Sequence, residues 1–285
     1  MKGLPVPPKR RDTERKELMQ MPTLVDMLEA GVHFGHKKER SHPRAKDYIF
    51  TLREGVYVID LDKTRDFLEK ALEYLKRQVT SGKTILFVGT KRQAKEIVKK
   101  VAENVGMPYI VKRWLGGTLT NFETIKRNLQ ELDRLEAQTK SPEFENLTKK
   151  EKKAINDKLA RLLDTFGGVR QMKNLPDAIF IVDCAREDIA VREANIMEIP
   201  VVGTCDTDAD PTKITYPIPA NDEAAKSIEM IMSSVQAALL EGQKSKPVQE
   251  EVVTEKKVST KKSKVSKSKK PARQAKQGVA GGEKK

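Results

Sequence analysis

Five short runs of apolar, mostly branched residues recur along this chain, and segments with helical periodicity separate them. The runs cover residues 56–61, 84–89, 109–111, 178–183 and 200–204. Strands that are buried on both faces have such near-continuous Val/Ile runs, and the helices between them supply the crossovers of a parallel sheet. The pattern therefore predicts an α/β fold, with a mostly parallel, doubly wound sheet, helices on both faces and right-handed crossovers.

Four helices are expected around this sheet. One is capped by Asp62, one is capped by Thr90, one covers residues 187–198, and one runs from its cap at Asn221 to about residue 240. Oxygen atoms of Asp, Thr and Asn side chains suit these positions because they accept hydrogen bonds from the first free N–H groups of a helix. A shorter amphipathic helix is expected at residues 24–34.

The alternation breaks between residues 119 and 170, where two long apolar stripes follow one another. Ser141-Pro142 ends the first stripe, Thr148 and Glu151 form a capping-box pattern before the second, and Gly167-Gly168 ends it. The stripes are narrow and surrounded by charge, which favours an antiparallel coiled-coil hairpin that protrudes from the sheet domain. The alternative is a pair of helices packed within the main body.

Charge is divided unevenly along the 285 residues, whose net charge is +14. Residues 22–118 carry +7, residues 119–170 carry +2 and residues 171–241 carry −8, while residues 1–21 and 242–285 add +3 and +10. A body with one basic and one acidic half suggests an oriented polyanionic partner such as nucleic acid. We therefore predict a flexible basic extension (1–21), a sheet domain (22–118 and 171–241), a hairpin insertion (119–170) and a disordered Lys-rich tail (242–285).

Several classes of protein are excluded. No apolar run reaches the roughly 18 residues that a membrane helix needs, and the N-terminus lacks the apolar core of a secretory signal. Cys184 and Cys205 cannot form a disulfide framework, fit a reducing cytoplasm and are expected to be small core residues. Because the sequence shows no Ser/His/Asp, Cys/His or paired-carboxylate arrangement, we expect neither catalysis nor a cofactor.

The first candidate site begins with the segment GVHFGHKKERSHP. Residues 37–53 hold six basic side chains against two acidic ones, with Tyr48 and Phe50 between them. Basic groups bind phosphates and aromatic rings stack on bases, so this mixture predicts an RNA contact. His33 and His36 have a spacing that two zinc ligands could use, but the neighbouring sequence offers too few further ligands. We assign these rings to contacts with RNA or with the backbone.

The turn Gly89-Thr90-Lys91-Arg92 is the second candidate, because it follows a strand and precedes a helix. Free N–H groups at a helix N-terminus, together with two cations, suit a phosphate of a nucleotide or of RNA. An ordinary turn with solvated charges is the alternative, and the chain has no GxGxxG fingerprint. The candidate RNA-binding residues of the chain are His33, His36, Lys37, Lys38, Arg40, Arg44, Lys46, Lys91, Arg92, Lys95, Arg113 and Asn121.

Asp206, Asp208 and Asp210 follow the last predicted strand, at the edge where doubly wound sheets place ligands. Pro211 and Pro217 stand where a calcium-binding loop would need Gly and Glu. A weak magnesium site and an acidic docking surface remain as interpretations, but solvated carboxylates beside a turn are favoured. We therefore predict no metal site.

Arg113 and Trp114 stand at the expected junction between the sheet and the hairpin. Trp114 is the only tryptophan of the chain. Its ring could anchor the junction by packing, or it could stack on a base. Large aromatic side chains are usually buried, which favours the anchor.

Six long motifs occur in a fixed order. They are GVHFGH (31–36), LFVGTKR (86–92), RWLGGTLTN (113–121), LTKKE (147–151), LPDA (175–178) and IPAND (218–222). Over residues 24–241 the chain thereby resembles the bacterial small-subunit ribosomal protein S2 family. The resemblance implies an α/β domain with a protruding coiled-coil hairpin, binding to small-subunit rRNA, contacts with other ribosomal proteins and help in docking the large mRNA-binding protein S1. It does not extend to residues 1–20 or to the Lys-rich tail.

Three functions thus compete: a structural rRNA-binding protein, a flavodoxin-like enzyme or nucleotide binder that uses the 89–92 turn, and a docking scaffold whose hairpin recruits a protein. The first and third are compatible. The missing nucleotide fingerprint and the missing catalytic set weigh against the second.

Overall fold

The structure is a computed structural model that describes residues 21–245. Almost all of the predicted basic extension and of the predicted tail lie outside these residues. The last helix continues to Lys244, so residues 242–244 belong to the folded body and not to the tail. Among the described residues, no helix combines the length and the hydropathy that crossing a membrane requires.

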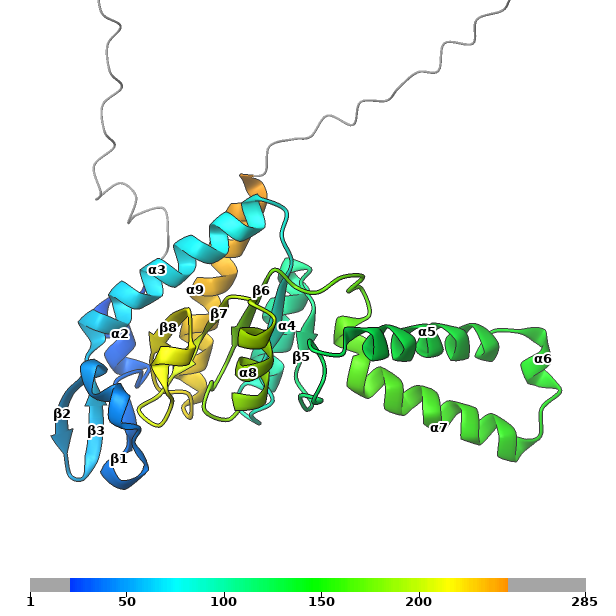
Figure 1. Cartoon of the computed structure of the whole chain (residues 1–285), viewed down its shortest axis with the longest axis horizontal. Coiled ribbons are helices and arrows are strands. Elements are labelled where there is room, and N and C mark those ends of the chain that lie inside the picture. Colours follow the sequence, from blue (N-terminus) through cyan, green and yellow to red (C-terminus); the bar gives the residue numbers. More distant parts are fainter. Residues whose placement is uncertain (1–20, 246–285) are drawn as a thin grey trace, which may run out of the picture. The chain divides into compact units, whose positions relative to one another are not determined.

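A five-stranded parallel sheet lies at the centre of the structure, as predicted (Figure 1). Its strands are β4 (Ile85–Val88), β5 (Tyr109–Ile110), β6 (Ala178–Ile181), β7 (Val201–Cys205) and β8 (Tyr216–Pro219), in the order β5-β4-β6-β7-β8. Strand β8 was not predicted, because Pro217 and Pro219 remove N–H donors from the segment. At the edge of a sheet a strand can lose these donors without leaving a neighbour unpaired.

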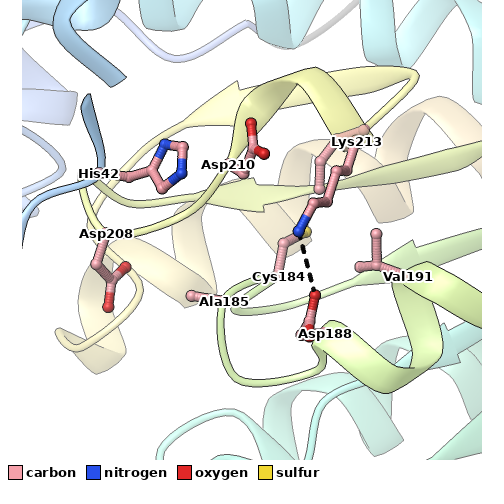
Figure 2. Close-up of a pocket in the computed structure, with 9 residues that line it drawn as sticks. His42, Cys184, Ala185, Asp188, Val191, Asp208, Asp210 and Lys213 are labelled. Carbon is pink, nitrogen blue, oxygen red and sulfur yellow. Dashed lines mark ion pairs between the residues drawn. The ribbon is translucent and has the colours of Figure 1, made fainter. Parts of the chain in front are cut away.

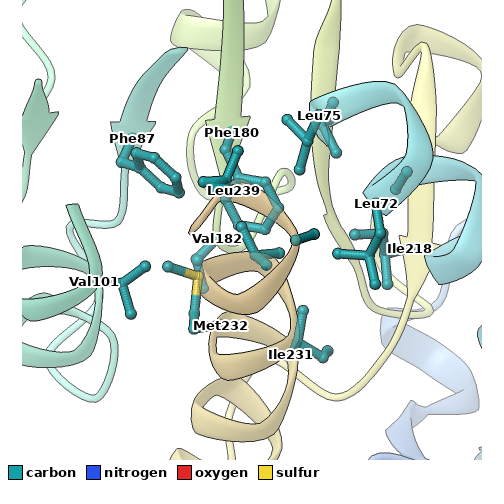
Figure 3. Close-up of a cluster of buried hydrophobic side chains, with 14 of the residues drawn as sticks. Leu72, Leu75, Phe87, Val101, Phe180, Val182, Ile218, Ile231, Met232 and Leu239 are labelled. Atoms are coloured by element: carbon teal, nitrogen blue, oxygen red, sulfur yellow. The ribbon is translucent and has the colours of Figure 1, made fainter. Parts of the chain in front are cut away.

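Helices cover both faces of this sheet, because successive side chains of each strand point to opposite faces. Helices α3 (Leu61–Thr80), α4 (Lys95–Val105) and α9 (Ala225–Lys244) pack on the face that presents Phe87 and Phe180. Figure 3 shows Met232 and Leu239 of α9 in this core. Helix α8 (Asp188–Ile196) packs on the opposite face, against Ile179 and Ile181.

Three helix starts differ from the predictions. Asp60, not Asp62, caps α3, with Oδ1 accepting from the N–H of Asp62 at 3.1 Å. Thr90 caps no helix, because a turn separates it from the start of α4 at Lys95. Asn221 does accept from two backbone N–H groups, but these precede α9, which begins at Ala225.

The run 56–61 does not join the parallel sheet. Its residues form β3 (Val56–Ile59), the central strand of a small antiparallel sheet with β1 (Phe34–Lys37) and β2 (Ile49–Arg53). Helix α2 (Leu24–Glu29) precedes this small sheet. Only Ile59 of β3 is fully buried, so a short apolar run alone could not distinguish a half-buried hairpin strand from a core strand.

Residues 119–170 form two long helices, α5 (Phe122–Thr139) and α7 (Lys149–Phe166), joined through the short α6 (Pro142–Glu145). Figure 1 shows α5 and α7 side by side. The predicted capping box of Thr148 and Glu151 is present at the start of α7. Phe122 and Phe166 belong to the same apolar cluster as Ile179 of the sheet, and Lys158 pairs with Glu131 at 2.6 Å between the two helices.

Candidate nucleic-acid interface

The small antiparallel sheet and the loops beside it carry the first group of predicted residues. Lys37, Lys38 and Lys46 are exposed, and no ion pair engages them within residues 21–245. Phe34 and Phe50 are 54% and 73% exposed. Free cations and open aromatic faces are thus presented by one continuous segment, which is the composition that RNA-binding surfaces use.

The same segment also carries three cationic groups that are not free. His36 pairs with Asp206, Arg40 with Asp208 and Arg44 with Asp210, at 3.0, 3.1 and 3.6 Å. Each partner in turn comes from the loop that follows β7. We name these three pairs the 36–44/206–210 ladder. The ladder therefore ties the small sheet to the carboxyl end of β7, although the two segments are about 170 residues apart in sequence.

The ladder changes the interpretation of Asp206, Asp208 and Asp210, which the sequence suggested to be solvated carboxylates. Asp206 is buried at 3% exposure, and the side chains of Asp208 and Asp210 are 11% and 15% exposed. These carboxylates are therefore not solvated loop charges. They form ion pairs with basic residues of the same chain. Among the described residues, no group of three or more His, Cys, Asp or Glu side chains could hold a metal ion.

His36 is the most buried cation of the ladder. Its Nδ1 lies 3.0 Å from Asp206, and its Nε2 lies 3.3 Å from Oε1 of Glu223. The contact with Asp206 raises the pKa of His36 to about 9, although burial and Arg40 oppose the shift. The ring is therefore an imidazolium at neutral pH, held inside the protein and not placed for stacking on a base.

This geometry predicts a pH-dependent stability. Since the folded pKa of about 9 exceeds the ordinary value of 6.5, the stabilisation by His36 is complete below pH 6.5 and is lost as the pH rises toward 9. After discounting for solvent screening, the loss amounts to about 1–2 kcal/mol. Urea unfolding from pH 6 to 9 should show this decline in the wild-type protein and a smaller decline in His36→Gln. An equal decline in His36→Gln would contradict the assignment, and His42→Gln is the control.

In the turn after β4, the lysine predicted to bind a phosphate is engaged by carboxylates of the same chain. Lys91 is only 9% exposed, and its Nζ lies 2.8 Å from Asp222 and 3.0 Å from Asp183. Burial lowers the pKa of Lys91, but the two carboxylates outweigh it and hold this pKa above its ordinary value. The cation is thus neutralised internally, while Arg92 is exposed and Lys95 is half-buried on α4.

The position of Lys91 also bears on the nucleotide-binding alternative. In a doubly wound sheet, ligands bind at the carboxyl ends of the strands where the strand order reverses. Here that place lies between β4 and β6. Lys91 follows β4, Asp183 follows β6, and their ion pair fills the place, with Thr90 donating to Glu187 beside it. At the ends of β4 and β6, Lys91 is therefore paired with the protein's own carboxylates and is not free for a phosphate.

A cavity of about 250 Å³ lies next to this place, between the ends of β6 and β7 (Figure 2). His42, Cys184 and Asp208 are among its lining residues, and Lys213 and Asp188 form an ion pair of 3.6 Å at its wall. The N-terminus of α8 reaches the cavity at Asp188, but this carboxylate repels a phosphate and pairs with Lys213, and the lining residues include no glycine-rich phosphate loop.

Trp114 lies at the base of the helix pair, and it is buried at 6% exposure. Its Nε1 donates to Glu193 of α8 at 3.1 Å, and Glu193 also accepts from the backbone N–H groups of Gly117, Leu119 and Thr120. Burial raises the pKa of Glu193, but these hydrogen bonds outweigh it and hold the pKa below its ordinary value. The hydrogen bonds to the carboxylate of Glu193 thereby hold the loop 113–121 in place.

The two other predicted residues of this loop are exposed. Arg113 forms no ion pair within the described part of the chain, and Asn121 immediately precedes α5. His33 is half-buried and packs on Phe34, with ring centroids 4.1 Å apart. Five of the exposed candidates therefore lie on residues 37–46, while Arg92 follows β4, Arg113 follows β5 and Asn121 precedes α5.

Sequence reasoning missed the buried carboxylates that organise these groups. Glu193 had a recognisable signal, because it stands on the apolar stripe of α8 beside Ala190 and Ala194. A carboxylate on such a stripe must find donors in the interior. Asp183 and Asp222 had no comparable signal, since their partner Lys91 is 92 and 131 residues away in sequence.

Comparison with known proteins gives a consistent result. A family profile described as "Ribosomal protein S2" matches residues 27–242. The small ribosomal subunit protein uS2 of a Nitratiruptor species is 46% identical over 222 residues, which are 78% of this chain and 83% of that protein. The uS2 protein of Dictyoglomus thermophilum is 48% identical over 219 residues, which are 77% of this chain and 89% of that protein.

Proposed function

This chain belongs to the ribosomal protein S2 family, and on that premise we propose that it is a structural constituent of the small ribosomal subunit that binds the subunit's RNA through its exposed basic residues. Members of this family are structural proteins and not enzymes. One observation carries the RNA-binding part of the proposal: the segment 34–53 presents unpaired lysines beside exposed aromatic rings.

The lysines of this segment are suited to phosphates. Lys37, Lys38 and Lys46 have no carboxylate partner in the described structure, so no internal ion pair must break when they bind. The ladder holds the backbone that carries them, because the paired residues His36, Arg40 and Arg44 lie within a few positions of these lysines along the segment. Two kinds of cation thus have two roles, one fixing the loop and one contacting RNA.

Replacing Lys37, Lys38 and Lys46 together with alanine should weaken binding to small-subunit rRNA and make it less salt-dependent. Each lost phosphate contact removes about one released counterion, so the slope of log K against log salt should become less negative by about 2–3. Filter binding to purified small-subunit rRNA from 50 to 300 mM KCl gives this slope. These concentrations are about those at which counterion release is normally measured.

The matched control replaces three exposed lysines outside the segment, Lys70, Lys83 and Lys226, and so removes the same charge. A slope that changes equally in both triple variants would mean that net charge alone controls binding. That result would remove residues 37–46 from the interface. Lys91→Ala is not used in this test, because Lys91 is buried in ion pairs.

The proposal includes a docking surface for protein S1. Phe50 and Leu52, two residues apart on the outer strand β2, are 73% and 45% exposed. Clusters of large exposed apolar side chains commonly mark interaction sites. These residues border the lysines proposed to contact RNA, so one sheet would join the RNA to a neighbouring protein.

We propose further that α5 and α7 act as a separate coiled-coil hairpin. The pair is held by its own apolar stripe and by ion pairs such as Lys158–Glu131, while α7 buries only Phe166 fully. Its base rests on the sheet through the cluster that contains Trp114 and Phe122. The sheet domain, the hairpin and the two ends of the chain are thus proposed as distinct parts with distinct contacts.

A further inference from the structure

The two cysteines of the chain lie near each other at the carboxyl ends of neighbouring strands: Cys184 is in the turn three residues after β6, and Cys205 is the last residue of β7. Strand β6 pairs with β7 so that Ile179 is opposite Val201, and the N–H of Ile179 donates to the carbonyl of Pro200, the residue before Val201. The N–H of Cys184 donates in the same way to the carbonyl of Thr204 at 3.1 Å. This bond continues the parallel pattern beyond the end of β6 and brings Cys184 beside Cys205.

Asp183 creates this alignment. Continuing the register of Ile181 and Gly203 would place Cys184 opposite Asp206. Asp183 has a φ of 67°, a left-handed conformation that side-chain-bearing residues seldom adopt, and it shifts the pairing by one residue. Neighbouring strands are about 4.8 Å apart, which falls within the Cα separations of roughly 4.4–6.8 Å that disulfides span.

The two thiols also share one face of the sheet. Both belong to the apolar cluster beneath α8. The Sγ atom of Cys184 would lie 2.5 Å from a Cβ atom at Gly203, and the Sγ atom of Cys205 lies 3.6 Å from the Gly203 carbonyl oxygen. Because Gly203 has no side chain, the sulfur atoms of both cysteines fit beside it.

We propose that Cys184 and Cys205 form a dithiol site that a low-molecular-weight disulfide, such as glutathione disulfide, oxidises to an intramolecular disulfide. This inference is independent of the RNA-binding proposal. Cys184 lines the cavity of Figure 2, whereas Cys205 is not among its lining residues, so Cys184 reacts first. Burial raises the pKa of the Cys184 thiol, so the reaction is slower than that of a free cysteine.

The chemistry balances with one equivalent of glutathione disulfide. The Cys184 thiolate attacks one sulfur atom of glutathione disulfide, and its S–S bond breaks to give a mixed disulfide and one glutathione thiolate. The Cys205 thiolate then attacks the Cys184 sulfur and displaces the second glutathione. Two protein thiols are oxidised, the glutathione disulfide is reduced, and the two thiol protons end on the two released glutathione molecules.

The test equilibrates the full chain with glutathione buffers of increasing disulfide content, stops exchange with acid, and alkylates the remaining thiols before mass spectrometry. The expected product is a monomer that is lighter by two hydrogen atoms, takes up no alkyl group and melts several degrees higher than the reduced protein. Cys184→Ser and Cys205→Ser should each fail to give this product, and their melting temperatures should not respond to the buffer.

A second series in urea just below the unfolding transition allows the cavity to open, so slow access cannot hide the reaction. Three results would overturn the proposal. The cysteines could accumulate mixed disulfides with glutathione that do not close, the chain could form covalent dimers, or both thiols could remain fully alkylatable in both series.

Discussion

Replacing Lys91 with methionine is expected to lower the free energy of unfolding by about 3–5 kcal/mol, because it leaves buried carboxylates without a cation. The Nζ atom of Lys91 lies between Asp183 and Asp222, and Asp222 is only 1% exposed. Burial and the neighbouring carboxylates of Asp183 and Asp206 raise the pKa of Asp222, and the positive charge of Lys91 opposes this shift. Without the positive charge of Lys91, nothing offsets the free-energy cost of burying the carboxylates of Asp183 and Asp222.

Urea unfolding at pH 7 measures this effect, and two variants make it specific. Arg92→Met removes an exposed neighbouring cation and should change stability by less than about 0.5 kcal/mol. Adding Asp222→Asn to Lys91→Met should restore part of the loss, because one buried charge is then removed. If Lys91→Met were as stable as Arg92→Met, the buried ion pairs described here would not exist in solution.

Replacing Glu193 with alanine is expected to cost about 3 kcal/mol, since several buried donors lose their acceptor at once. Oε1 accepts from Trp114 and Gly117, and Oε2 accepts from Leu119 and Thr120. Gly117 has a φ of 88°, so the loop has a conformation that a glycine must provide and that these bonds hold. Glu193→Gln should also destabilise, because its NH2 group would face N–H donors.

Trp114 gives this prediction a second measurement, because no other tryptophan contributes to the fluorescence. In Glu193→Ala the emission of the folded protein should shift to longer wavelength as water reaches the indole N–H. Glu229→Ala removes an exposed carboxylate from α9 and should leave both emission and stability unchanged. Unchanged emission in a destabilised Glu193→Ala would show that the carboxylate stabilises α8 without holding the loop.

The parts of the fold that the sequence predicted are those that local patterns determine. Continuous apolar runs predicted β4, β6 and β7, and the Thr148–Glu151 pair predicted the start of α7. β3 was assigned to the wrong sheet and β8 was missed, because the placement of each strand depends on the strands with which it pairs. β3 pairs with two strands of a separate sheet, and β8 contains prolines that only an edge position tolerates.

The candidate site was predictable only in its exposed part. Lys37, Lys38 and Lys46 lie where the composition of the segment suggested, and they are exposed. His36 and Lys91 are also basic residues in basic stretches of the sequence, yet they are buried against carboxylates. Which cations are neutralised depends on Asp206, Asp183 and Asp222, and a linear sequence does not show that these residues lie near them.

Association of the chain with small ribosomal subunits is the most direct test of the central claim. Small subunits that lack the endogenous homologue are mixed with the purified full chain at near-physiological salt and separated on a sucrose gradient. The wild-type chain should sediment with the subunits in a one-to-one ratio, and the Lys37/Lys38/Lys46 triple alanine variant should be largely released. A wild-type chain that stays at the top of the gradient, and instead binds a mononucleotide tightly, would contradict the claim.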